Sequence, residues 1–502
     1  MKKVLLIIGA IAMAFAAQAK DYTLSTPNST LIISADEGKA PMFRYYGSRA
    51  EVSDVRGAGR MINGQEAYPA FGTRCDRPYA SLVKQHDGDN AVKLVVEKVI
   101  ESKEGTVSTL SFLLRDVAHP TLAVKLNYSA YSDCDIIKMN TEYINEGKKP
   151  VVLQKYLSAV LPIQSDNCVL LHLDGTTKNE FNEHIEPLTN GVKIISTQAG
   201  SQVSKHVHAS FMLGLDGRLD ETNCPVVAGT LVWMGNFHFE FHNTLQNRAR
   251  TLFMGGINPA ASDYTLAAKQ SLATPEMVFA YSTEGKGGVT RTLHRWARKY
   301  QLLDGTKERE VLLNSWEGVH FDTTEENLNG MITDFAKLGG EMFVVDDGWF
   351  GPKYPRNNGV SSLGDWGIAK SKLPNGIRPL IDLTHKNGMK FGIWIEPEMV
   401  NVKSELYEKH PDWVLRHPDF EPSYGRGGGQ MLLDLTNPKV QDHVFSIVDN
   451  ILTENPDVYY IKWDNNMEMF NASSLYLPKA LQSNLQVEFT LALEKILKRI
   501  RA

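Results

Sequence analysis

The sequence lacks a basic excess and is poor in cysteine, and each shortage argues against a class of function. Its 502 residues carry 53 Lys and Arg against 58 Asp and Glu, a net charge of −5 at pH 7. This balance argues against nucleic acid as the main partner. The cysteines form no CxxC pair, so zinc and thioredoxin-like sites are poorly supported. Their spacing leaves disulfide pairing open; the four are Cys75, Cys134, Cys168 and Cys224.

The start of the chain also lacks an apolar run long enough to cross a membrane. The run from Val4 to Ala17 is shorter than the roughly 20 residues that a transmembrane helix needs. It follows Met1-Lys2-Lys3 and ends in Ala17-Gln18-Ala19, the positive start and small-x-small end of a secretory signal peptide. We therefore predict a signal peptide at residues 1–19, a bacterial periplasmic or secreted protein, and no membrane partner after cleavage.

A sustained helical period is missing from residue 20 to residue 288. Short runs of β-branched and aromatic residues, such as Ser29–Ile33 and Val226–Val232, alternate there with turn residues. Regular spacing of such runs predicts an N-terminal antiparallel β-sandwich over residues 20–288.

Two histidine pairs lie within this region, His206 with His208 and His238 with His242. Each pair shares one face of an expected strand, an arrangement that is compatible with a metal site. Because no acidic or cysteine ligand recurs beside them in this reading, we interpret them as ordinary strand histidines.

The pattern changes after a linker helix that we expect at residues 289–309. From Glu310 onward, buried-looking strands alternate with helices, which indicates parallel βα units. About five such strands are expected over residues 310–502, whereas a (β/α)₈ TIM barrel needs eight. We therefore predict an incomplete barrel whose later strands are missing. The expected strands are Val311–Trp316, Glu341–Asp347, Lys390–Pro397, Met431–Leu435 and Val458–Asp464.

The stretch Tyr459–Asn466 has the pattern of a buried strand that opens onto solvent. Lys462 and Asp464 are two residues apart, so their side chains point to the same side of a strand. A neighbouring lysine keeps a carboxylate ionised, and an ionised carboxylate at a barrel strand end suits the nucleophile of a glycosidase. The alternative is that Asp464 caps the following helix.

Other expected strand ends carry residues suited to a sugar. They are Asn314-Ser315-Trp316, Asp346-Asp347-Gly348-Trp349 and Trp394-Ile395-Glu396-Pro397-Glu398. Carboxylates accept strong hydrogen bonds from hydroxyl groups, and aromatic faces cover the apolar face of a pyranose ring. Packing or helix capping would explain any one cluster, but four clusters on one rim predict a sugar site.

The run from about Val226 to the end resembles glycoside hydrolase family 36, the clan D α-galactosidases, and Glu66–Gly72 is a fainter match. The matching strings are Gly235-Asn236-Phe237, Thr274-Pro275-Glu276, Asn314-Ser315-Trp316-Glu317, Phe343-Val344-Val345-Asp346-Asp347-Gly348-Trp349-Phe350-Gly351, Leu363-Gly364-Asp365-Trp366, Lys372-Leu373-Pro374-Asn375-Gly376, Phe391-Gly392-Ile393-Trp394-Ile395-Glu396-Pro397-Glu398-Met399-Val400, His410-Pro411-Asp412-Trp413 and Ile461-Lys462-Trp463-Asp464.

The resemblance implies a β-sandwich, a (β/α)₈ barrel and a small C-terminal β-domain. It implies retaining hydrolysis of terminal α-galactosides, in oligosaccharides or polysaccharides, through a glycosyl-enzyme intermediate. It implies no metal or organic cofactor, and it is compatible with a homo-oligomer of the full-length protein.

The same resemblance assigns roles to eight residues. Asp464 is the expected nucleophile, Lys462 lies against it and the ring hydroxyls, and Asn466 reaches the C2 hydroxyl. Asp346 and Asp347 hold the C4 and C6 hydroxyls. The other expected substrate-binding residues are Trp316, Trp394 and Arg426.

The sequence departs from the family pattern in three ways. The general acid of the family follows the nucleophile by several tens of residues, which places it beyond Ala502 together with the later strands and the C-terminal domain. Arg426 lies four residues before Gln430, where the family has two. An acidic residue that many members insert from a neighbouring subunit cannot be placed here.

These departures lead us to expect a C-terminally truncated chain that is weakly active or inactive. The alternatives are a non-catalytic remnant that binds galactosides, and, within the family, an α-N-acetylgalactosaminidase or a galactosyl-transferring relative.

Overall fold

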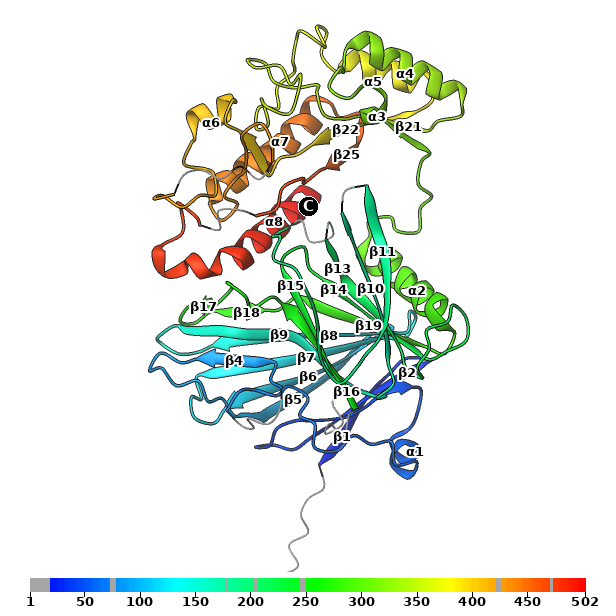
Figure 1. Cartoon of the computed structure of the whole chain (residues 1–502), viewed down its shortest axis with the longest axis vertical. Coiled ribbons are helices and arrows are strands. Elements are labelled where there is room, and N and C mark those ends of the chain that lie inside the picture. The colour runs from blue at the N-terminus through cyan, green and yellow to red at the C-terminus, as the bar shows by residue number, and fades with distance from the viewer. Residues whose placement is uncertain are drawn as a thin grey trace, which may run out of the picture.

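The computed structural model describes residues 19–72, 78–176, 178–201, 206–243, 250–420, 424, 426–469 and 473–502. The predicted signal peptide therefore lies outside the described residues apart from Ala19, and so does Cys75. Cys134, Cys168 and Cys224 are buried as free thiols. Two regions are stacked along the long axis, with α8 between them (Figure 1). No helix in the described part of the chain is long and apolar enough to cross a membrane.

The N-terminal region is a sandwich of antiparallel sheets, as predicted from the sequence. The larger sheet has ten strands in the order β11-β10-β13-β14-β19-β8-β7-β6-β5, with β18 beside β8. Its strands are β5 (Leu94–Glu104), β6 (Val107–Asp116), β7 (Leu122–Tyr131), β8 (Ile136–Asn145), β10 (Val169–Thr176), β11 (Asn179–Pro187), β13 (Val207–Gly214), β14 (Val226–Val232), β18 (Ser271–Ala273) and β19 (Glu276–Ser282).

Two smaller sheets complete this region. A six-stranded sheet has the order β12-β15-β16-β9-β17 with β4 beside β9, and a three-stranded sheet has the order β1-β2-β3. The elements are β1 (Lys20–Ser25), β2 (Ser29–Ala35), β3 (Met42–Ser48), α1 (Val52–Gly57), β4 (Ser81–Lys84), β9 (Val151–Gln164), β12 (Gly191–Ser196), β15 (Phe237–Asn243), β16 (Arg250–Ile257) and β17 (Tyr264–Leu266).

Aromatic side chains join the two large sheets. Phe211 of β13 meets Phe241 of β15 and Phe253 of β16, with ring centroids 5.0 Å and 4.7 Å apart. The alternation of inward and outward side chains along each strand delivers these rings to one shared core. Burial of alternate side chains in this core explains why the strands could be predicted from the sequence.

The helix after the sandwich begins earlier than predicted. α2 (Gly285–Trp296) continues directly into η2 (Ala297–Gln301), whereas the linker helix was expected at residues 289–309. Val289 and Trp296 are buried against sandwich residues such as Val226 and Val278. The helix is therefore part of the sandwich surface.

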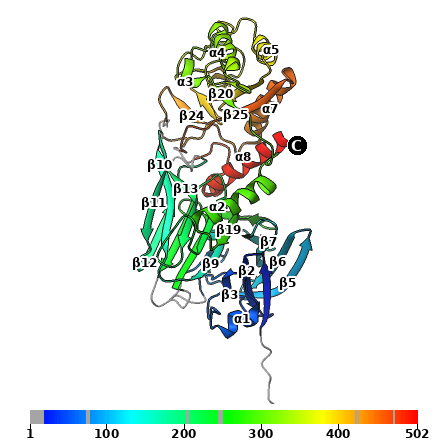
Figure 2. The same ribbon diagram turned by 90° about the vertical axis from the view of Figure 1, so that its right-hand side faces the viewer.

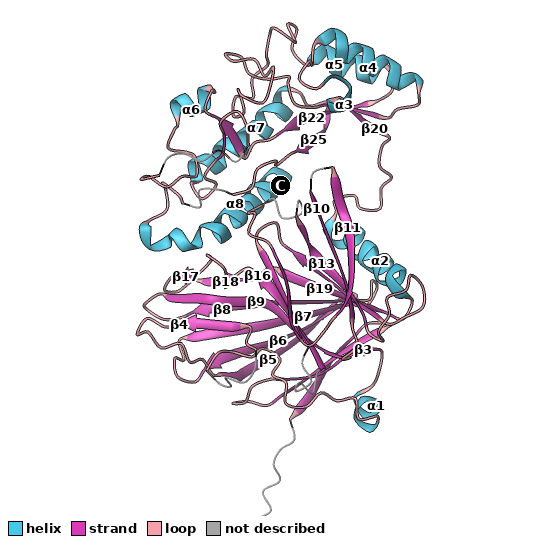
Figure 3. Ribbon diagram, viewed as in Figure 1, coloured by secondary structure: helices cyan, strands magenta, loops and turns pink. Residues whose placement is uncertain are grey.

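The C-terminal region is a partial (β/α)₈ barrel, as predicted. Four parallel strands have the order β20-β21-β22-β25, and the longer helices apart from α2 lie in this region or at its junction with the sandwich (Figure 3). The elements are β20 (Leu312–Asn314), α3 (Trp316–Val319), α4 (Glu325–Lys337), β21 (Met342–Val345), α5 (Arg378–Lys386), β22 (Lys390–Ile395), β23 (Met399–Asn401), α6 (Glu405–Lys409), β24 (Gln430–Leu432), α7 (Pro438–Glu454), β25 (Val458–Trp463), η3 (Lys479–Asn484) and α8 (Leu485–Arg501).

The assignment of Met431–Leu435 to the barrel sheet is wrong. β24 pairs antiparallel with β23 in a separate two-stranded sheet, and β22 pairs directly with β25. Met431, Leu432 and Leu433 are all buried, and a short buried apolar run does not reveal which partner covers it. The described residues therefore form four parallel strands where five were expected.

Helix α8 lies between the two regions in both views (Figures 1 and 2). Val487 belongs to the sandwich core, whereas Phe489 and Leu493 belong to the barrel core. On the sandwich, the hydroxyl of Tyr264 donates to Glu488 at 2.6 Å, and the backbone N–H of Thr265 donates to Asn484 at 2.8 Å. The helix thus fixes the barrel onto the sandwich.

Candidate active site

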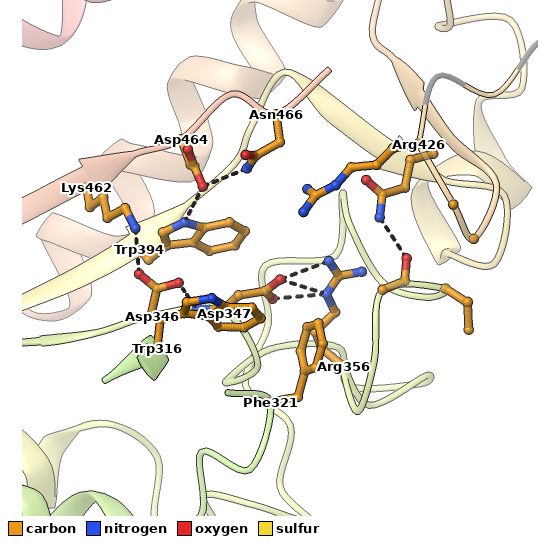
Figure 4. A pocket seen from close by; sticks show the side chains of 15 residues that line it. Trp316, Phe321, Asp346, Asp347, Arg356, Trp394, Arg426, Lys462, Asp464 and Asn466 are labelled. Carbon is orange, nitrogen blue, oxygen red and sulfur yellow. Dashed lines mark hydrogen bonds and ion pairs between the residues drawn. The ribbon is translucent and has the colours of Figure 1, made fainter. Parts of the chain in front are cut away.

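A cavity of about 510 Å³ opens at the carboxyl ends of the parallel strands (Figure 4). This is the edge at which barrel enzymes carry their chemistry. All eight residues predicted from the sequence line it. The lining residues are Trp316, Phe321, Asp346, Asp347, Arg356, Gly359, Val360, Trp394, Arg426, Gly427, Gly428, Gln430, Lys462, Asp464 and Asn466.

Asp346 follows β21 and is held by a lysine from the far strand. Lys462 Nζ lies 2.8 Å from Asp346 Oδ2, and Asn314 Nδ2 donates to the same oxygen at 2.5 Å. Lys462 was expected beside Asp464, but its ion pair in the structure is with Asp346. The ends of neighbouring strands lie close together at the mouth of a barrel. The long side chain of Lys462 on β25 therefore reaches past β22 to Asp346 at the end of β21.

Asp347 forms a buried bidentate pair with Arg356. Arg356 Nε and Nη2 lie 3.0 Å and 2.9 Å from the two carboxylate oxygens, and Arg356 is only 1% exposed. Its Nη1 also donates to the carbonyl of Ser361 and to Asn401. Burial raises the pKa of Asp347 above its ordinary value, although Arg356 acts in the opposite direction. The pair presents a fixed acceptor to the cavity.

Asp464 is anchored at the end of β25 by donors that carry no formal charge. Its Oδ2 accepts from Trp394 Nε1 at 3.1 Å and from Asn466 Nδ2 at 2.7 Å. Its Oδ1 accepts from the backbone N–H of Asn465 at 3.0 Å, and its own N–H donates to the carbonyl of Ile395. Asp464 precedes an irregular segment, so the alternative of a helix cap is wrong.

Two further carboxyls lie behind Asp464. Glu396 and Glu398 follow β22, are at most 1% exposed, and do not line the cavity, so Trp394 is the residue of this expected sugar-binding cluster that reaches it. Burial raises the pKa of Glu396 to about 8, and the charge of Asp464 adds to this shift. Burial also raises the pKa of Glu398 to about 7.

The apolar wall of the cavity comes from rings on three segments. Trp394 is 2% exposed and stacks on Phe350, with ring centroids 6.1 Å apart. Trp316 meets the edge of Phe321 at 5.0 Å. The aromatic cluster offers a rigid apolar surface beside the carboxylates, which is the combination that a sugar ring needs.

Arg426 reaches the cavity although it lies two residues further from Gln430 than in the family pattern. Arg426 and Gln430 form an isolated antiparallel bridge, and the intervening turn has positive φ at Gly428 and Gly429, 80° and 66°. A side chain at Gly428 would meet the carbonyl oxygen of Gly359 at 2.6 Å. The glycine turn therefore accommodates the extra residues and keeps Arg426 on the rim.

Comparison with known proteins agrees with this geometry. The family model for the glycosyl hydrolase family 36 N-terminal domain matches residues 38–267, and the Melibiase model matches residues 271–502. The crystal structure of the family 36 α-galactosidase AgaA from Geobacillus stearothermophilus is 28% identical, with a TM-score of 0.88, and the match covers 96% of this chain and 70% of that one.

The chain belongs to glycoside hydrolase family 36.

Curated relatives in sequence carry α-galactosidase names. AgaA of Geobacillus stearothermophilus is 32% identical over 453 residues, which is 87% of this chain and 60% of that protein. Alpha-galactosidase C of Emericella nidulans is 33% identical over 380 residues, 74% of this chain and 50% of that protein. This family 36 chain thus spans about half to three-fifths of the length of these relatives.

Arg356 and Phe321 are the site residues that the sequence did not reveal. Both lie in loops after strand ends, and no local pattern marks a loop residue that folds back onto the cavity. Arg356 is nine residues after Asp347, so only the folded loop shows that they pair. A buried arginine demands a carboxylate partner, but burial itself cannot be read from that loop.

The histidine pair His238 and His242 has an acidic partner that was not predicted. His238 and His242 lie 2.9 Å and 2.8 Å from the two carboxylate oxygens of Glu240, which Lys155 also contacts at 2.6 Å. An acidic residue therefore does lie beside this pair, contrary to the prediction. Although burial opposes it, these contacts lower the pKa of Glu240 well below its ordinary value. Within the described ranges, no group of three or more His, Cys, Asp or Glu could hold a metal ion.

Proposed function

We propose that the cavity is the galactose subsite of a retaining α-galactosidase and that Asp464 is its nucleophile. The observation that carries the proposal is one cavity that joins Asp464, the pair Asp346 and Asp347, and Trp394. A single hexose in this space would meet a carboxylate for its anomeric carbon, acceptors for its hydroxyls, and a ring for its apolar face. The α-galactosidase names of the relatives support galactose as that hexose.

The proposed first step is a displacement at the anomeric carbon. A carboxylate oxygen of Asp464 attacks C1, the bond from C1 to the leaving oxygen breaks, and the leaving oxygen takes a proton from a general acid. Water then hydrolyses the glycosyl ester with the same group acting as base. Retention of configuration follows from the two successive inversions.

The carboxylates of the described cavity do not supply that acid. Apart from Asp464 they are Asp346 and Asp347, and each forms an ion pair, with Lys462 and with Arg356. Burial raises the pKa of Asp347, but Arg356 donates to both of its oxygens, so neither oxygen is placed to pass a proton to a leaving group. General acid help is worth about 10²–10⁴-fold, so we expect residues 1–502 to hydrolyse ordinary galactosides slowly.

A substrate whose leaving group needs no proton tests the nucleophile separately from the acid. We expect α-galactosyl fluoride to esterify Asp464, since fluoride departs with the electron pair of its bond to C1. We expect the ester to persist, because among the described residues that line the cavity the other carboxylates, Asp346 and Asp347, are engaged in ion pairs. Intact-mass spectrometry should show one added galactosyl group, and peptide mapping should place it on Asp464. Asp464→Ala should abolish the adduct, while the exposed control Asp449→Ala should keep it.

Two results would contradict this proposal. An adduct that survives Asp464→Ala would mean that another residue is the nucleophile. Rapid hydrolysis of methyl α-galactoside, whose methoxide leaving group needs a proton, by residues 1–502 and its loss in Asp464→Ala would mean that the described cavity has a proton donor of its own.

We also propose that the protein is exported before it meets its substrate. The two lysines at the start and the Ala17-Gln18-Ala19 end support cleavage after Ala19. Expressed from the full gene segment in a bacterium, the protein should appear in the periplasmic fraction with Lys20 as its first residue by N-terminal sequencing. A product that stays in the cytoplasm and retains Met1 would contradict this.

A further inference from the structure

Glu396 is the most buried acidic group near the cavity, and the chemistry proposed above does not use it. It is 0% exposed and lies directly behind Asn466. Its Oε1 accepts twice from that residue, from the backbone N–H at 2.9 Å and from Nδ2 at 2.8 Å. Its Oε2 is buried without a hydrogen-bond partner among the described residues. A buried carboxyl oxygen without a hydrogen-bond partner lowers the stability of the folded chain, so packing alone does not account for Glu396.

The contacts of Asn466 show what Glu396 does. Asn466 Nδ2 donates to Asp464 Oδ2 at 2.7 Å as well as to Glu396. Both neighbours present acceptor oxygens, so the amide nitrogen must face them and both of its hydrogens are used. The amide oxygen Oδ1 is left as the polar atom that Asn466 can offer to the cavity, which it lines beside Asp464 (Figure 4).

We propose that Glu396 is a positioning residue: by holding the backbone and side chain of Asn466, it directs Nδ2 at Asp464 and Oδ1 at the C2 hydroxyl of the bound sugar. This inference rests on the proposed galactose subsite. Without Glu396, the amide could turn over and present a donor to a hydroxyl that needs an acceptor. Glu396 thus affects sugar binding and the orientation of Asp464 through Asn466, without contacting the sugar or the attacking oxygen itself.

The charges around Glu396 are consistent with a neutral acceptor. Asp464 and Asp347 face it with negative charge, and Arg426 Nη1 lies 3.9 Å from Oε1 with positive charge. Burial and the charge of Asp464 outweigh the hydrogen bond from Asn466 and the charge of Arg426, and they raise the pKa of Glu396 to about 8. A proton on Oε2 leaves Oε1 free to accept from Asn466. Glutamine has the same shape and the same neutral charge, so it should preserve the arrangement, whereas leucine should not.

The test compares binding of two sugars to residues 20–502 by calorimetry. Galactose carries the C2 hydroxyl, and 2-deoxygalactose lacks it. Glu396→Leu should weaken galactose binding by about tenfold, the value of one well-placed hydrogen bond, and should leave 2-deoxygalactose binding unchanged. Glu396→Gln should bind both sugars within about twofold of the parent chain. Glu398→Gln is the matched control, since that buried carboxyl contacts Trp463 and Asn465 but not Asn466.

Each outcome decides one of the two proposals. If the parent chain binds neither sugar, the galactose subsite fails. If the parent chain binds galactose but Glu396→Leu weakens both sugars equally, or neither, the positioning role is overturned. Thermal unfolding monitors folding of every variant, and Glu396→Ala replaces Glu396→Leu if the larger side chain prevents folding. If all three Glu396 variants unfold, the residue serves stability, and the positioning role is likewise overturned.

Discussion

The two acidic walls of the cavity are built on opposite principles. On the wall after β21, each carboxylate faces a cation, Asp346 with Lys462 and Asp347 with Arg356. On the side after β22 and β25, Asp464 in the cavity wall and the buried Glu396 and Glu398 behind it accept from amide, indole and hydroxyl groups instead. Arg426 Nη1 approaches only to 3.9 Å from Glu396 Oε1. The side-chain donors are Trp394, Trp463, Asn465, Asn466 and Ser201.

This difference separates holding a sugar from attacking it. A carboxylate bonded to a cation keeps its position, so it serves as a fixed hydroxyl acceptor. A carboxylate held by uncharged donors is oriented without being neutralised, and its electrons remain available to an electrophilic carbon. The cost falls on the carboxyls behind this wall: burial raises the pKa of Glu396 to about 8 and the pKa of Glu398 to about 7.

The largest expected loss of stability comes from removing Arg356, the cation that pairs with Asp347 on the wall after β21. Arg356→Met leaves Asp347 buried without its partner, and breaking a buried pair costs about 3–5 kcal/mol. Urea unfolding of residues 20–502 should show this loss. The control Arg378→Met removes an exposed arginine from Asp382 and Asp457 and should cost at most about 1 kcal/mol. A loss for Arg356→Met no larger than for the control would erase the distinction between the walls.

The second prediction concerns the effect of pH on Glu396 and Glu398, the carboxyls buried behind Asp464. The ordinary pKa of Glu396 and Glu398 is 4.5, and the folded values are about 8 and about 7. The folded state keeps protons that the unfolded state releases between these values, so the free energy of unfolding falls as pH rises through this window. The slope is at most about 1.4 kcal/mol per pH unit for each group.

The double variant Glu396→Gln and Glu398→Gln isolates this contribution. Buried histidines such as His443, whose pKa burial lowers, change stability in the opposite direction below pH 6.5 in both proteins. The difference between the two stability curves, measured by urea unfolding from pH 5 to pH 8, should therefore grow in favour of the variant as pH rises. Parallel curves would mean that these carboxyls ionise normally in the folded chain.

The carboxylates of the two walls could be predicted from the sequence, but the side chains that bond to them could not. Asp346, Asp347 and Asp464 were found because polar residues directly follow buried strands, and that pattern is local. The partners are set by distances across the barrel mouth: Lys462 bonds to Asp346 rather than to Asp464 two residues away, and Arg356 comes from a loop. Side-chain periodicity fixes a face of a strand, but it does not say which strand end a long side chain will reach.

The same limit explains the errors in the fold. The sandwich was predictable because each strand alternates around one shared core. Met431–Leu435 was misassigned because a run buried by β23 has the same composition as one buried in a barrel. Glu240 was overlooked although it lies between His238 and His242 on one strand face, so the strand period itself could have found it.

The smallest predicted effect tests whether the sandwich supports the wall of uncharged donors. Ser201 of the sandwich donates to Glu398 Oε2 at 3.3 Å and accepts from Asn465 Nδ2 at 2.8 Å. Asn465 Nδ2 also reaches Glu398 directly at 3.2 Å, so Ser201→Ala leaves those two groups bonded to each other. We expect a loss of only about 0.5–1.5 kcal/mol in urea unfolding.

A second readout separates support of the wall from general stability. Labelling of Asp464 by α-galactosyl fluoride should slow in Ser201→Ala, because Asn465 also holds Asp464 through its backbone N–H. Ser446→Ala removes a hydroxyl that bonds only within α7, to the carbonyl of His443, and should leave the labelling rate unchanged. Equal rates in both variants would mean that the barrel orients Asp464 without the sandwich, and that Ser201 contributes to the junction alone.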